Sequence, residues 1–62
     1  MTKQELQKQF DDEIAYWNEA LDEAYRKYKK GGMKFEDFNT RYFDAMARIE
    51  TLEYAKRMVE SL

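Results

Sequence analysis

The chain has 62 residues, of which 44% are hydrophobic and 39% charged, and its 11 basic and 13 acidic residues leave a net charge of −2. This length allows one small domain, and the near balance of charge indicates neither a polyanion nor a membrane surface as a partner. Cysteine and histidine are both absent, which excludes disulfides, thiolate metal sites and the commonest general base of enzymes.

These exclusions predict a protein that is not an enzyme and that holds no cofactor or metal. The longest run without a charged residue is far shorter than the roughly 20 apolar residues of a membrane-spanning helix, and no signal peptide opens the sequence. We therefore expect a cytoplasmic protein without membrane contact.

The first predicted helix covers about residues 3–30. Thr2 and Glu5 match the capping-box pattern at its start, in which Glu5 reaches back to the Thr2 amide. Apolar residues then recur at alternating steps of four and three, the a/d pattern of a helical seam. The seam contains Phe10, Ile14, Trp17, Leu21, Ala24 and Tyr28, and Leu6 and Tyr25 widen it.

A turn at Gly31-Gly32 follows this helix. These are the only two glycines of the chain, and there is no proline. Gly31 can take the left-handed conformation that ends a helix without a Cβ clash, and Gly32 frees the chain to reverse. Lys34 is then the expected N-cap of the next helix, with Met33 and Phe38 spaced as a hydrophobic staple.

The second predicted helix covers about residues 35–60. Its seam contains Phe35, Phe38, Tyr42, Ala45, Ile49, Leu52 and Val59, with Met46 alongside and Lys56 as the only interruption. Folding back at the glycines places Tyr28 opposite Phe35, and Trp17 opposite Ala45. The sequence therefore predicts an all-α fold, an antiparallel two-helix hairpin in a single domain of residues 1–62. Because a lone hairpin buries only one stripe per helix, we expect a homodimer that forms a four-helix bundle.

A second apolar stripe follows the other side of the second helix. It is formed by Phe43, Ala47, Tyr54 and Met58, at steps of four, seven and four. The first helix offers only a thin counterpart in Ala15, or in Tyr16 and Ala20. A helix that is apolar over this much of its circumference usually has two neighbours. We interpret the stripe as the homodimer interface, in preference to a surface for another protein.

Two charged clusters are weaker candidates for binding. Five cations around the turn, with tyrosines between them, could bind phosphates or stack bases, although complementarity to the helix dipole explains them more simply. They are Arg26, Lys27, Lys29, Lys30 and Lys34. The acidic cluster could bind a metal or a basic protein surface, but we favour a solvated helix face. It consists of Asp11, Asp12, Glu19, Asp22 and Glu23.

The resulting hypothesis is a small non-enzymatic regulator, inhibitor or adaptor that acts by binding another protein through its helical surfaces. It includes the possibility of a phage-type protein. Two alternatives stay open. One is a nucleic-acid-binding module that uses the basic turn, and the other is a purely structural, self-assembling hairpin.

Overall fold

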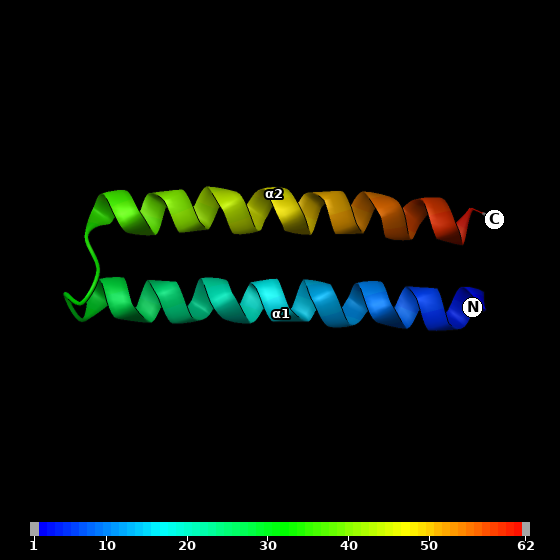
Figure 1. Ribbon diagram of the computed structural model, residues 1–62, viewed down its shortest axis with the longest axis horizontal. Coiled ribbons are helices and arrows are strands. Elements are labelled where there is room, and N and C mark those ends of the chain that lie inside the picture. Colours follow the sequence, from blue (N-terminus) through cyan, green and yellow to red (C-terminus); the bar gives the residue numbers. More distant parts are fainter. Residues whose placement is uncertain (1, 62) are drawn as a thin grey trace.

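The computed structural model describes residues 2–61 and shows two antiparallel helices that pack side by side along their whole length (Figure 1). Helix α1 comprises Lys3–Lys29 and helix α2 comprises Phe35–Glu60. The molecule measures 45 × 15 × 12 Å. The predicted all-α hairpin is thus confirmed, and no helix within residues 2–61 is long and apolar enough to cross a membrane.

Both helix starts lie where the sequence places them, but only one is capped by a side chain. The Thr2 hydroxyl accepts a hydrogen bond from the Glu5 amide at 3.1 Å. The return bond of a capping box, from the Thr2 amide to the Glu5 carboxylate, does not occur in the described chain. Lys34 is the N-cap of α2 in an extended conformation and gives no side-chain cap, because its ammonium group cannot accept a hydrogen bond.

The turn ends α1 with a Schellman motif. The Gly31 amide donates to the Tyr28 carbonyl at 3.1 Å, and the Gly32 amide donates to the Lys27 carbonyl at 2.9 Å. Gly31 has φ +81°, the left-handed conformation that this motif requires. The Lys27 and Tyr28 carbonyl groups at the end of α1 are therefore satisfied by the turn itself.

The two glycines predict different responses to substitution. Gly31→Ala is expected to lower the free energy of unfolding by about 1 kcal/mol, because an L-residue at positive φ is strained. A Cβ at Gly31 would meet no atom within 4 Å, so this cost is conformational and not steric. Gly32→Ala is the matched control: its Cβ would lie 3.5 Å from the Lys27 carbonyl oxygen, an ordinary contact. Urea unfolding of both variants tests this; equal losses would contradict it.

The core between the helices is thin. Only Ala24, Ala45, Ile49 and Val59 are buried, and no side chain in the described chain is completely removed from solvent. Several predicted seam residues are half-buried, among them Ile14, Trp17, Leu21 and Leu52. Three other predicted seam residues are not buried: Tyr25, Phe35 and Tyr42 are 50%, 60% and 40% exposed. They lie at the edge of the seam, where a hairpin has no third element to cover them.

An ion pair joins the helices near their open end. The Lys56 ammonium lies 2.6 Å from an Asp11 carboxylate oxygen. The hydrogen bond to Asp11 and the attraction of its charge raise the pKa of Lys56 above its ordinary value of 10.5, with weaker contributions from Glu60 and Glu53 and an opposing one from burial. Lys56, which interrupts the apolar seam, is thus half-buried and paired with α1.

The raised pKa predicts a pH-dependent contribution to stability. A group whose pKa is higher in the folded state stabilises the fold fully below its unfolded pKa, and this stabilisation is lost as the pH rises through the folded pKa. We expect Asp11→Asn to lower Tm at neutral pH and the difference from wild type to shrink above pH 10.5. Thermal unfolding of Asp11→Asn and of Asp12→Asn, an exposed neighbour, provides the comparison. A Tm difference unchanged at alkaline pH would contradict the ion pair.

Candidate functional site: two exposed apolar surfaces

The predicted apolar stripe of α2 lies on the side of the helix that faces away from α1. At about 100° per residue, its members are roughly 140–180° around the helix from the buried Ala45. We call it the outer stripe; it consists of Phe43, Ala47, Tyr54 and Met58. Phe43, Tyr54 and Met58 are 63%, 61% and 56% exposed. The hairpin thus has three large apolar side chains on one helix that do not face α1; the Phe43 ring contacts Tyr42 of the same helix edge to face, with 5.9 Å between centroids.

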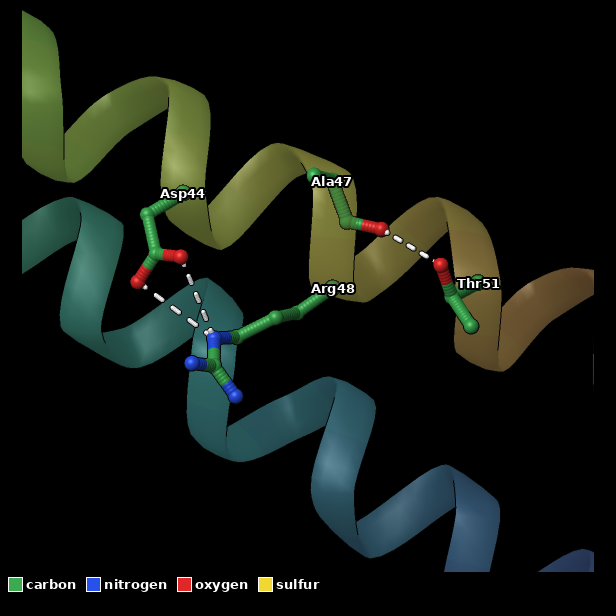
Figure 2. A network of polar contacts seen from close by, with 4 residues as sticks. All are labelled: Asp44, Ala47, Arg48 and Thr51. Carbon is green, nitrogen blue, oxygen red and sulfur yellow. Dashed lines mark hydrogen bonds and ion pairs between the residues drawn. The ribbon is translucent and has the colours of Figure 1, made fainter.

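The hydroxyl groups beside the outer stripe are already satisfied. Thr51 donates to the Ala47 carbonyl at 2.9 Å (Figure 2), and Thr40 donates to the Glu36 carbonyl at 3.0 Å. Ser61, one turn beyond Met58, donates to the Arg57 carbonyl in the same way. Because an unpaired donor is costly to bury, these bonds within the helix make the surface better suited to contact with an apolar partner.

A second exposed surface surrounds the turn end of the hairpin, and sequence analysis missed it. We call it the aromatic face; it consists of Tyr25 and Tyr28 from α1 and of Phe35, Phe38 and Tyr42 from α2. Phe38 is its centre: its ring centroid lies 4.9 Å from Tyr28 in a stacked arrangement, 6.2 Å from Tyr25 and 5.9 Å from Tyr42. Tyr28 also contacts Phe35 at 6.0 Å, the pair that folding back at the glycines predicts.

The sequence does hold a signal for this face. Six of the ten aromatic residues lie between positions 25 and 43, on both sides of the turn. Helical periodicity assigns Tyr25, Phe35 and Tyr42 to the seam because it gives the direction of a side chain but not the width of the neighbour that covers it. The clustering of aromatic residues in the chain, and not their period, marks the surface.

On the opposite side of the hairpin, the charged side chain of Arg48 covers Trp17. The guanidinium of Arg48 lies 4.7 Å from the centroid of the Trp17 ring, a cation–π contact between the helices. The Arg48 Nε donates to both carboxylate oxygens of Asp44, at 3.3 and 3.4 Å (Figure 2). An open groove of about 440 Å³ lies here, lined by Glu13, Trp17, Asp44, Ala47, Arg48, Thr51 and Leu52. Its charged lining contrasts with the largely uncovered rings of the aromatic face.

The basic cluster predicted at the turn is dispersed in the structure. Only Lys27 and Lys34 of the five share the hollow there, which has about 510 Å³ and is also lined by Gly31, Gly32, Met33, Asp37 and Arg41. Lys29 instead lies over the Tyr25 ring at 5.5 Å, and Arg26 lines a separate hollow with Glu23. Arg41 is a further cation at the turn that sequence analysis did not include, and Asp37 reduces the positive charge of the hollow.

The acidic residues of α1 are all exposed, and their side chains have different neighbours. Asp11 is paired with Lys56, whereas Glu19 and Glu23 line a hollow of about 170 Å³ with Tyr16, Ala20 and Arg26. Asp12 and Asp22 are exposed and form no ion pair within residues 2–61. Within residues 2–61, no three acidic side chains come close enough together to hold a metal ion.

Comparison with known proteins adds no functional information. No protein-family model, no curated protein and no solved structure matches the chain.

Proposed function

We propose that the protein is a non-enzymatic regulator, inhibitor or adaptor that acts by binding another protein, as a dimer in which two hairpins form a four-helix bundle. The observation that carries this proposal is the outer stripe: Phe43, Tyr54 and Met58 are each more than half exposed on the side of α2 opposite α1. Exposed aromatic and methionine side chains in a row are typical of the anchors of protein interfaces.

The sequence alone favoured the outer stripe as the homodimer interface, but its position on α2 favours another protein, rather than a second copy, as its partner. The four helices of a bundle surround one core, so each hairpin must contribute a face made by both of its helices. The outer stripe belongs to α2 alone, and a second hairpin placed on it would extend the molecule into a flat row of helices. A single helix with apolar anchors at such spacing fits the groove of another protein.

Photo-cross-linking in the cells that produce the protein tests the partner. Tyr54 is replaced by the photoreactive amino acid p-benzoylphenylalanine, and Tyr16, which is 63% exposed on α1, is replaced in a matched control. The proposal expects position 54 to form a defined adduct with one other protein that position 16 does not form. Adducts of the same size and yield at both positions, or only with the chain itself, would contradict it.

The basic turn supports nucleic-acid binding as a second candidate, on the observation that Lys27, Lys34 and Arg41 line one hollow. Phosphate binding by these cations would make the affinity fall steeply with salt. Titration of a fluorescent single-stranded DNA at low and high salt, with Lys34→Glu as the variant, separates the two candidates. If the protein acts by binding another protein through the outer stripe, Lys34→Glu should not change its affinity for DNA.

A further inference from the structure

The hairpin exposes more surface than a compact protein of its mass. Its accessible surface is 5139 Å², whereas a folded monomer of 7.6 kDa is expected to expose about 4,300 Å². The difference is roughly 800 Å², which is the area that each partner buries in a protein interface of standard size. The structure thus leaves about one interface uncovered.

The aromatic face has the composition to supply the apolar part of that area. At about 200 Å² for each aromatic side chain, the exposed parts of its five rings amount to roughly 400 Å². This is close to the apolar share of one side of an interface of about 800 Å². Unlike the outer stripe, the face is built by both helices, so that a second hairpin placed on it would enclose a core of four helices.

The apolar surface ends half-way along the hairpin. Towards the open end, the residues around Ile14 are charged and line a hollow of about 340 Å³; they are Asp11, Glu53, Lys56, Arg57 and Glu60. Two copies would therefore overlap only through the halves that carry the turn. The overlap covers about residues 35–46 of α2, which is roughly 18 Å at 1.5 Å per residue.

The charges decide the orientation of the second copy. Five cations lie within residues 26–34, of which Lys27 and Lys34 share one hollow at the turn. Six acids without a basic residue lie within residues 11–23; Asp11 among them already pairs with Lys56, and Glu19 and Glu23 share a hollow with Arg26. A parallel dimer would bring the two basic turns together, and like charges at an interface are costly. An antiparallel overlap of about 18 Å instead places each turn beside the acidic segment of the other copy.

We propose that a second copy of the chain covers the aromatic face in antiparallel orientation, with the basic turn of each copy against residues 11–23 of the other. This inference rests on the dimer of the proposed function and identifies its interface. It leaves the outer stripe of both copies free for the other protein, so the two surfaces have separate roles.

Light scattering and sedimentation across a dilution series test the interface. Phe35→Glu places a charge in the aromatic face, and it suits the first turn of α2, where acidic residues are favourable. The expected result is a wild-type dimer whose Kd rises at least about tenfold in Phe35→Glu. Tyr25→Lys, with a cation near the end of α1, is expected to do the same. The matched control is Tyr54→Glu, equally exposed on the outer stripe, with a change of less than about threefold.

Two further readouts test the orientation. Raising the salt concentration is expected to weaken the dimer, because the pairing of basic turn and acidic segment is screened. The maximum dimension from small-angle X-ray scattering is expected near 70 Å, since two hairpins of 45 Å overlap by about 18 Å. A dimer of about 45 Å that strengthens with salt would overturn the antiparallel arrangement.

Other outcomes would overturn the interface itself. These are a wild-type protein that is monomeric at every concentration, or a dimer that Tyr54→Glu dissociates and Phe35→Glu does not. Circular dichroism of each variant confirms that its helices are intact. A monomer would overturn this interface together with the dimer of the proposed function, but it would leave partner binding through the outer stripe untouched. Loss of the cross-linked adduct at position 54 would leave the dimer untouched, so partner binding and dimerisation are tested separately.

Discussion

Ile49→Ala is expected to lower the free energy of unfolding by about 3 kcal/mol, the largest effect on stability of any truncation in this chain. Ile49 is one of four buried residues within residues 2–61, and it is the largest of them. Its truncation removes three carbon atoms from the thin layer between α1 and α2, and a slender hairpin has few neighbours that could move in to fill the cavity. The measurement is chemical unfolding followed by circular dichroism.

The effect of Ile49→Ala should be large compared with the total. Domains shorter than about 70 residues rarely have more than 3–5 kcal/mol of stability from their core, so the variant should be substantially unfolded at 25 °C. Ile49→Val is the graded control, with an expected loss of about 1 kcal/mol. Met58→Ala removes a side chain of similar size that is 56% exposed. It should change the free energy of unfolding by less than about 0.5 kcal/mol, which separates the effect of burial from that of size. Similar losses in Ile49→Ala and Met58→Ala would show that the two helices do not share a packed core.

The local features of this fold were predictable from the sequence because their causes are local. Gly31 and Gly32 are the only glycines, and they form the turn that their positions predict. The Thr2 cap needs only the Glu5 amide three residues later. For the same reason the helix period was sufficient to place Phe43, Tyr54 and Met58 on one stripe, away from the residues that meet α1.

The features that sequence analysis missed depend on the relation between the two helices. The contact of Arg48 with Trp17 and the pair of Lys56 with Asp11 require the relative register of α1 and α2 to within one turn. The exposure of Tyr25, Phe35 and Tyr42 depends on a third layer that a hairpin lacks. Periodicity indicates the direction of these side chains, and only the packed structure shows that nothing covers them.

The separation of the two exposed surfaces has a consequence for how the protein would work. In the proposed dimer, the aromatic faces are buried between the hairpins, and the outer stripes of the two α2 helices stay exposed. Two identical stripes on one dimer allow two contacts with a dimeric or repetitive partner, and linked contacts raise the apparent affinity well above that of either one. Phe35→Glu should then weaken binding of such a partner although position 35 lies outside the outer stripe.

Tyr54→Ala is expected to weaken the complex with the partner protein by about 2 kcal/mol, which is roughly a 30-fold rise in Kd. Tyr54 lies between Ala47 and Met58 in the outer stripe, at steps of seven and four, and tyrosine is among the residues that contribute most to protein interfaces. Tyr16→Ala, which removes a ring of equal exposure from α1, should leave Kd within about threefold. The partner identified by the cross-link at position 54 is titrated with each variant.

Because Tyr54 is 61% exposed, its truncation should leave the unfolding curve nearly unchanged, so that a loss of affinity reports the contact and not the fold. Equal affinities of wild type and Tyr54→Ala would remove the outer stripe from the binding surface.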